Sequence, residues 1–258
     1  MSTHLYCVLP RALGASVPSG LTGIEGAGVR ALEAGSLSAW VSDVDHRLPI
    51  SIDGVRAHDC VVEAALETGS TPVPARYGQR FDDDDACRVA LALRGSSIDA
   101  LLANVEGQVE MTLILTPSTK RMIHDLEPMV ATMVAEGGLA GASSGSTGGA
   151  GRQYLERLRA REAATNAIRK TMDSLANRLA EAATRFVRRS AMHEQMTQLP
   201  LRTMSHLISR EVVDQYKEVV GAVRAGSESR FLVIGPRAPY SFCALGGTSG
   251  AHGMKLAD

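Results

Sequence analysis

Four consecutive aspartates and seven dispersed histidines are the side chains in this sequence best suited to metal binding or acid–base chemistry. The aspartates occupy residues 82–85 and precede an Ala/Leu-rich stretch that predicts a helix of about 20 residues. A divalent cation needs ligands that converge, as the spaced ligands of an EF-hand do, and consecutive carboxylates do not converge. Helix N-termini favour acidic side chains because their amides are unpaired and the helix dipole is positive there. The aspartate run therefore predicts a helix start rather than a metal site.

The histidines and cysteines do not form a recognisable catalytic set. His58 lies next to Asp59 and five positions before Glu63 on a predicted helix, which is a poor geometry for a shared site. Cys60, on the same Ala/Val-rich helix, is predicted to be an inert thiol rather than a nucleophile. No Gly-x-Ser-x-Gly turn occurs, and the Gly-rich residues 137–151 lack the Lys-Ser or Lys-Thr ending of a phosphate-binding loop. The sequence therefore predicts no catalytic residues, no cofactor and no metal.

Composition predicts a cytoplasmic protein. The four cysteines occur singly, without a Cys-x-x-Cys pair, as is typical of reduced thiols in the cytosol. No apolar run reaches the roughly 18 residues that a transmembrane helix needs. The N-terminus also lacks the charged and then apolar regions of a secretory signal. We therefore expect no membrane contact.

Residues 152–189 contain no Gly or Pro, and their apolar or small residues recur at alternating steps of three and four, which predicts one long helix with a single apolar seam. The seam residues are Leu155, Leu158, Thr165, Ile168, Met172, Leu175, Leu179, Ala182 and Phe186. Ten basic and four acidic residues share this stretch. Either the basic residues form a solvated face above a packed seam, or the helix is a docking surface for an acidic or apolar partner. The candidate contacts are Arg157, Arg161 and Arg169.

Proline and aromatic residues cluster in two further segments, residues 72–78 and 235–242. The prolines stiffen the chain and remove backbone donors, so each segment is predicted to be either a plug at a sheet edge or a partner surface. The candidate contacts are Arg76, Tyr77, Arg237 and Tyr240. Alternation along the second segment places Tyr240 and Phe242 on one face, and we expect Phe242 to pack into the core of the C-terminal domain.

Periodicity predicts an α+β protein with two domains. The N-terminal domain, residues 1–118, is expected to hold a small antiparallel or mixed sheet with helices on one face. Its predicted strands lie near residues 4–9, 37–44, 71–78 and 105–116, its helices at 53–67 and after 82–85, and a short helical turn at 29–34. Residues 119–151 are predicted to be a helical and Gly/Ser-rich linker. Residues 152–258 are predicted to form a ferredoxin-like domain with an oversized first helix, followed by strands near 194–199 and 203–209, a helix at 211–225 and a strand at 230–234.

The net charge of −1 hides an asymmetry between the two halves of the chain. Residues 1–136 carry 18 acidic and 10 basic residues, whereas residues 137–258 carry 10 acidic and 17 basic residues. The halves could attract each other, or the basic half could face a negative partner. Nucleic acid is a weak candidate for that partner because the basic helix lacks interleaved aromatic residues and no nucleic-acid-binding signature accompanies it.

Six short motifs, in a consistent order across almost the whole chain, carry a resemblance to a known family. They are Leu5-Tyr6-Cys7-Val8, residues 37–42, His58, the stretch from Thr71-Pro72 to Arg76-Tyr77-Gly78, Gly151-Arg152-Gln153-Tyr154-Leu155, and residues 235–242. On these motifs the sequence resembles the gas vesicle accessory proteins F and L, the GvpL/GvpF family. Arg237 and Ala238 stand where the family has Trp and Pro, so the role of that aromatic residue does not carry over.

The resemblance implies a non-enzymatic role in the assembly of gas vesicles, the protein-shelled flotation organelles of bacteria and archaea. It implies contacts with the small hydrophobic shell protein GvpA and with other gas vesicle accessory proteins. It also implies two domains, of which the C-terminal one is ferredoxin-like. The residues alone leave two alternatives open: a small-molecule enzyme on an α+β scaffold, and a nucleic-acid-binding module that uses the basic helix.

Overall fold

The structure is a computed structural model that describes residues 2–13, 16–44, 50–117, 149–196, 200–223 and 229–243. The chain divides into two compact units. Unit 1 comprises Met1–Met111, Leu207–Glu211 and Gly235–Asp258, and unit 2 comprises Thr112–His206 and Val212–Ile234. A compact unit need not be an independently folding domain, so the boundaries predicted at 118/119 and 151/152 stay a prediction.

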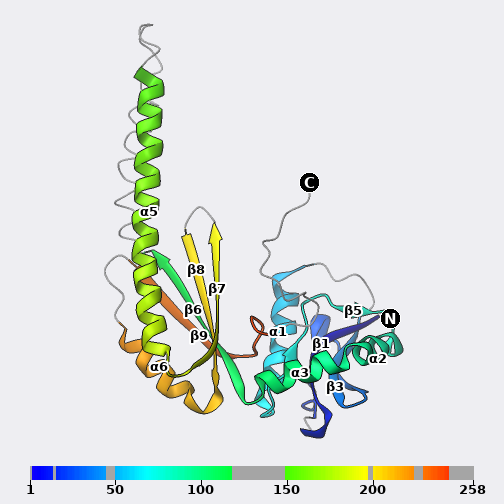
Figure 1. Cartoon of the computed structure of the whole chain (residues 1–258). Helices are drawn as coiled ribbons and strands as arrows, with labels where there is room; N and C mark the ends of the chain where they lie inside the picture. Colours follow the sequence, from blue (N-terminus) through cyan, green and yellow to red (C-terminus); the bar gives the residue numbers. More distant parts are fainter. Residues whose placement is uncertain are drawn as a thin grey trace. The chain divides into compact units, whose positions relative to one another are not determined.

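Unit 1 is built on an antiparallel sheet with the strand order β2-β3-β1-β4, in which β5 also pairs with β1 (Figure 1). The strands are β1 Ser2–Pro10, β2 Arg30–Ala34, β3 Leu37–Val44, β4 Val73–Pro74 and β5 Arg80–Phe81. The helical turn predicted at residues 29–34 is wrong, because these residues form β2. Ala34 pairs with Leu37 across a two-residue hairpin, and Gly35 supplies the positive φ of 64° that such a turn requires.

Local hydrogen bonds decide where the helices of unit 1 begin. Helix α1, Ile52–Glu67, is capped by Ser51, whose Oγ accepts from the amide of Gly54 at 3.0 Å. Helix α2, Asp84–Leu93, is capped by Asp83, which confirms the aspartate run as a helix start. The single helix predicted after this run is instead two, because α3, Gly95–Val105, starts anew after Arg94. Short 3-10 turns, η1 Arg11–Leu13 and η2 Ile24–Gly26, complete the unit.

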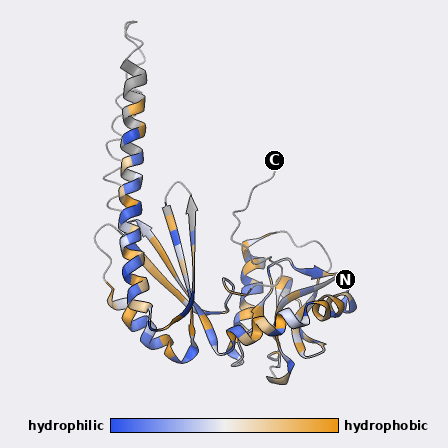
Figure 2. Ribbon diagram, in the orientation of Figure 1, coloured by the Kyte–Doolittle hydropathy of each residue, from blue (hydrophilic) through white to orange (hydrophobic). Residues whose placement is uncertain are grey.

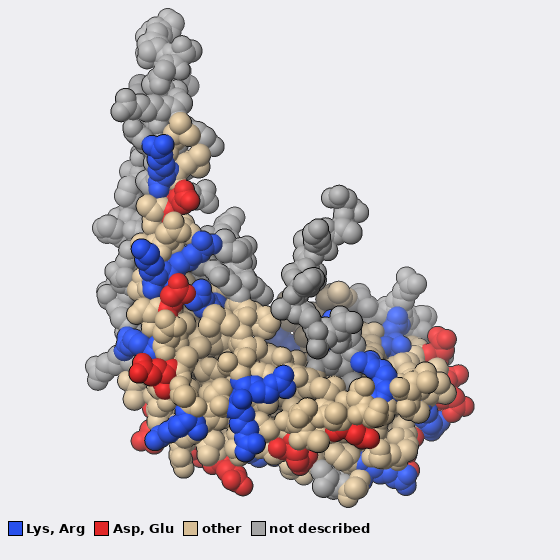
Figure 3. All heavy atoms as spheres, in the orientation of Figure 1, with Lys and Arg blue, Asp and Glu red and all other residues tan. Residues whose placement is uncertain are grey.

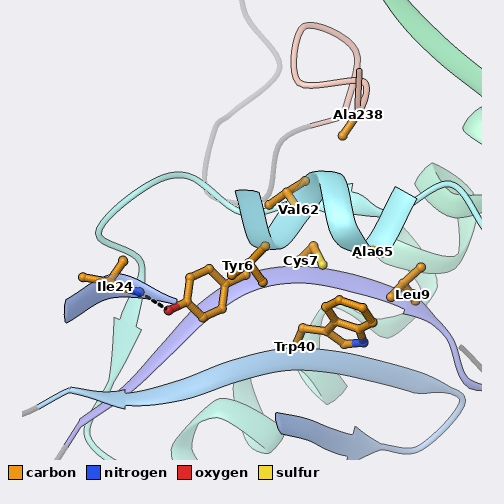
Figure 4. Packing of buried hydrophobic residues seen from close by; sticks show 9 residues of the cluster. Tyr6, Cys7, Leu9, Ile24, Trp40, Val62, Ala65 and Ala238 are labelled. Carbon is orange, nitrogen blue, oxygen red and sulfur yellow. Dashed lines mark hydrogen bonds between the residues drawn. The ribbon is translucent and has the colours of Figure 1, made fainter. Parts of the chain in front are cut away.

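The core of unit 1 lies between the sheet and α1. Its buried cluster consists of Tyr6, Cys7, Leu9, Ile24, Trp40, Val61, Val62, Ala65 and Ala238 (Figure 4). Trp40, the only tryptophan of the chain, is fully buried here. Ala238 reaches this cluster from the far end of the sequence, so the C-terminal segment is part of the same core.

The second sheet has the strand order β7-β8-β6-β9. Its strands are β6 Gln108–Pro117, β7 Val187–Met196, β8 Pro200–Ser209 and β9 Ser229–Arg237, and its helical elements are α5 Gly149–Ala183, η3 Arg210–Val212 and α6 Val213–Ala222. The prediction that residues 105–116 belong to the N-terminal sheet is wrong, since β6 lies between β8 and β9. Two antiparallel sheets with flanking helices confirm the α+β class and correct the mixed N-terminal sheet.

Helix α5 is shorter at its C-terminal end than predicted. It ends at Ala183 rather than at residue 189, because residues 187–196 pair as strand β7. Polar and apolar residues alternate along its length (Figure 2). The helix predicted at residues 118–136 and the linker up to residue 148 lie outside the described residues. Within the described part of the chain, no helix combines the length and apolar character that crossing a membrane requires.

Candidate partner-binding site

Residues 235–243, here called the C-terminal strap, are held against α1 by an ion-pair network. Arg237 pairs with both Asp59 and Glu63, at 3.5 Å for Glu63, and the Ala238 amide donates to Glu63 Oε1 at 3.4 Å. Burial raises the pKa of Glu63, although the Ala238 amide and the Arg237 charge act in the opposite direction. Asp59 and Glu63 lie one turn apart on α1 and therefore on the same helix face, so both carboxylates can reach the guanidinium of Arg237.

The distal part of the strap is anchored through Glu110 on β6. This carboxylate is 5% exposed and accepts from the Ser241 amide at 2.8 Å and from the Ser241 hydroxyl at 2.7 Å. The Cys243 thiol donates to the Pro239 carbonyl oxygen at 3.3 Å. Hydrogen bonds to a charged group are stronger than neutral ones, so Glu110 fixes the turn that follows Pro239.

The strap places Tyr240 and Phe242 differently from the sequence prediction. Tyr240 packs against the unit 1 core cluster, and burial raises the pKa of its hydroxyl. Phe242 is buried at 9% exposure and belongs to unit 1, so its predicted packing in a C-terminal core is wrong. The reason is that the chain returns to the sheet–α1 core after β9. The predicted partner-binding roles of Arg237 and Tyr240 stay predictions, and both side chains already have contacts within unit 1.

The motif residues from the first third of the chain converge in one buried polar cluster. Tyr6 Oη lies 2.7 Å from Ser42 Oγ and accepts from the Ile24 amide at 2.9 Å. His58 Nδ1 lies 3.0 Å from His4 Nε2, and the Tyr77 ring stands edge-on to His58 with the ring centroids 5.9 Å apart. The motifs therefore build the interior of unit 1, and within the described residues no group of His, Cys, Asp or Glu is arranged to hold a metal.

The sequence analysis singled out His58 but not its hydrogen-bond partner His4, nor the pairing of Ser42 with Tyr6. A usable signal existed for His4, because it lies two residues before Tyr6 on a strand and alternation places such residues on one face. Arg76 is exposed, whereas Tyr77 is half-buried against the cluster. Arg76 is thus the member of the first proline segment whose side chain is open to solvent.

The seam of α5 is buried along only part of the helix. Met172, Leu175 and Leu179 are at most 2% exposed. Leu155 and Leu158, which belong to the same predicted stripe, are 54% and 43% exposed. In Figure 1 the N-terminal half of α5 extends past the ends of β7 and β8, which explains the difference.

Basic side chains accompany this seam. Figure 3 shows Lys and Arg side chains along α5, interspersed with acidic ones. Arg159 is exposed, and Arg169 is half-buried and engaged in contacts. The backbones of Arg157 and Arg161 lie in α5, but their side chains are outside the described part of the structure. Both proline segments belong to unit 1, whereas α5 belongs to unit 2.

Comparisons with known proteins cover nearly the whole chain. The solved structure of the gas vesicle protein GvpF from Anabaena sp. PCC7120 is similar, with a TM-score of 0.69 and 15% sequence identity over 93% of this chain and 97% of that one. The structure of GvpF from Microcystis aeruginosa is also similar, with a TM-score of 0.68 and 18% sequence identity over 93% of this chain and 98% of that one. At these identities the likeness shows a shared fold. A comparison with curated protein sequences finds no significant match. The model of the gas vesicle synthesis protein GvpL/GvpF family matches residues 2–244, and the chain therefore belongs to this family.

Proposed function

We propose that this protein is a non-enzymatic factor of gas vesicle assembly that binds the shell protein GvpA and other gas vesicle accessory proteins in the cytoplasm. Membership of a gas vesicle synthesis family supports the general role. We propose the exposed N-terminal part of α5 as the contact surface, and we call Leu155 and Leu158 the open seam. The observation that carries this choice is that these two leucines continue a buried stripe but are 54% and 43% exposed.

The open seam has the chemistry of a helix-docking surface. Leu155 and Leu158 are three residues apart and therefore neighbours on one helix face. An amphipathic partner helix can lay its apolar face over such a pair. The leucines then stabilise the complex because their apolar surface is removed from water. Arg157, Arg159 and Arg161 flank the leucines in the sequence, so a partner with carboxylates beside its apolar face fits best.

The arrangement of unit 2 supports a ferredoxin-like fold as part of this proposal. The elements follow the order β6, α5, β7, β8, α6, β9, which is the β-α-β-β-α-β order of that fold. The strand order β7-β8-β6-β9 places the first and third strands of this series at the centre of the sheet. The first helix of the series is the 35-residue α5, so the added length carries the open seam.

A binding experiment on purified proteins tests the surface. The variant Leu155→Glu/Leu158→Glu should lose co-purification with tagged GvpA, because two carboxylates would replace the apolar contact and oppose an acidic partner. The matched control is Val89→Glu/Leu93→Glu on α2, where two aliphatic side chains are also exposed, at 60% and 83%. Circular dichroism and the Tm establish that both variants fold.

The outcome depends on what covers the open seam. GvpA retained by the folded α5 variant would overturn the proposed surface, and equal loss in both variants would indicate general apolar adhesion. If residues 118–136 of the chain itself occupy the seam, the α5 variant will have a lower Tm in the absence of GvpA while the α2 control will not.

Arg76→Ala tests the second candidate contact in the same assay, with a weakened salt-sensitive interaction as the expected result.

A further inference from the structure

Two buried histidines of unit 1 form a hydrogen-bonded pair that the proposed function does not use. His4 on β1 is fully buried and His58 on α1 is 3% exposed. His4 Nε2 lies 3.0 Å from His58 Nδ1, and His58 Nε2 lies 3.1 Å from the carbonyl oxygen of Ala75. A chain of two hydrogen bonds thus connects β1, α1 and the residue that follows β4.

The partners fix where the ring protons must be. The carbonyl oxygen of Ala75 can only accept, so His58 Nε2 carries a proton and donates it. Neutral His58 then offers an unprotonated Nδ1, and His4 Nε2 must donate to it. His4 Nδ1 is left as a buried acceptor without a hydrogen-bond partner among the described residues. The pair therefore accommodates one proton on each ring, and a third proton on His4 Nδ1 would have no acceptor among the described residues.

The surroundings of the pair disfavour a positive charge. The rings of Tyr6 and Tyr77 contact both histidines, and Arg80 on β5 adds a positive charge near His4. The nearby carboxylate is Asp59, which favours a charged His58, but Asp59 is itself paired with Arg237. A third proton would therefore meet desolvation and like charge with little compensation.

The pair adds to the attachment of residues 73–81, which also pair with β1 through β4 and β5. Strand β4 has only two residues, and Ala75 is tied to β1 by one further bond, from its amide to the Tyr6 carbonyl oxygen at 2.8 Å. The next tie to β1 is the Leu5 amide, which donates to the Gln79 carbonyl oxygen at 3.0 Å. Arg76 and Tyr77 lie between these two ties.

We infer that the His4–His58 pair is a proton-sensitive latch: a third proton places a buried, uncompensated charge on the pair, and residues 73–81 are released from β1 and α1 to relieve it. A proton on His58 Nδ1 replaces the acceptor by a second donor that faces His4. A proton on His4 Nδ1 creates a buried imidazolium without an acceptor. Opening of the segment lets the imidazolium reach water.

The direction of the pH dependence follows from burial. Desolvation, then the neighbouring His58 and Arg80, lowers the pKa of His4 from 6.5 to about 3, and desolvation also lowers the pKa of His58. A depressed folded-state pKa in a base means that the closed segment is stable above pH 6.5 and loses stability as the pH falls toward 3. For His4 alone, a shift from 6.5 to about 3 raises the opening constant about 25-fold between pH 7 and pH 5.

Hydrogen–deuterium exchange of the full chain tests the latch. Between pH 7 and pH 5, after correction for the intrinsic exchange rate, protection of residues 73–81 should fall by at least about tenfold. The double variant His4→Gln/His58→Gln keeps an amide donor at both positions but has no ring that titrates, and it should remove most of this pH dependence. Two controls should retain it: His193→Gln, which changes an exposed histidine, and His206→Gln, which changes a buried histidine of unit 2.

A second measurement on the unaltered protein keeps the inference testable if His4→Gln/His58→Gln does not fold. Side-chain nitrogen NMR should show both His4 and His58 neutral at pH 6 with the proton on Nε2. A charged ring at that pH, or a proton on Nδ1 of His58, would overturn the latch. So would a loss of protection in residues 73–81 that is the same in the wild type and in folded His4→Gln/His58→Gln.

Discussion

The hydroxyl of Tyr6 is predicted to hold the 3-10 turn η2 onto the core of unit 1, and Tyr6→Phe removes it without changing the ring. This oxygen accepts from the Ile24 amide at 2.9 Å and lies 2.7 Å from Ser42 Oγ (Figure 4 shows the first bond). All three residues are at most 1% exposed, so water cannot replace the lost partner without a structural change.

The magnitude follows from what the substitution leaves behind. An unsatisfied buried amide costs about 1–3 kcal/mol, and the loss of the Ser42 hydrogen bond costs about 0.5–1.5 kcal/mol more. Because the phenyl ring still fills the site, no large cavity adds to this sum. We therefore expect Tyr6→Phe to lower the free energy of unfolding by about 2–4 kcal/mol.

Urea unfolding followed by the fluorescence of Trp40 measures this loss, because Trp40 is the only tryptophan and belongs to the same core cluster. A double-mutant cycle with Ser42→Ala should give a coupling energy of about 0.5–3 kcal/mol. A loss within the roughly 0.5 kcal/mol of an ordinary surface substitution would refute the reasoning and show that the Ile24 amide finds another partner.

Two further predictions address the seam of α5 and the start of the C-terminal strap. Leu175→Ala should lower the free energy of unfolding by about 2–5 kcal/mol, because Leu175 is 2% exposed; an unchanged Tm would show that the seam is not packed. Gly235→Ala should lower the free energy of unfolding by more than the roughly 1–3 kcal/mol of backbone strain. The φ of Gly235 is 128°, and an added Cβ would also lie 2.7 Å from the Glu110 carbonyl oxygen. A thermal unfolding curve identical to that of the wild type would disprove this.

Local sequence patterns determined most of the elements. The apolar period of residues 152–189 predicted α5 and its seam, because a helix places residues three and four apart on one face whatever surrounds it. The aspartate run predicted the start of α2, since an unpaired amide is satisfied by a neighbour in the sequence. The motif series indicated the family, which the family match over residues 2–244 confirms.

Tertiary structure decided which sheet a strand joins and how much of a seam is covered. A strand pattern records which residues face inward but not which neighbour supplies the hydrogen bonds, so β6 was assigned to the wrong sheet. Similarly, Leu158 and Leu175 look equivalent in the sequence, yet they are 43% and 2% exposed. The difference arises because the helix extends beyond the elements that cover the C-terminal part of its seam.

Convergence of distant segments was also beyond the sequence. His4, Ser42, His58 and Tyr77 meet only because β1 pairs with β3 while α1 packs across the sheet. The strap packs against α1 because Arg237 pairs with Asp59 and Glu63, which are far away in the sequence. Each of these contacts depends on loop closure and strand register, which are properties of the whole folded chain, whereas helix period and capping are set within a few residues.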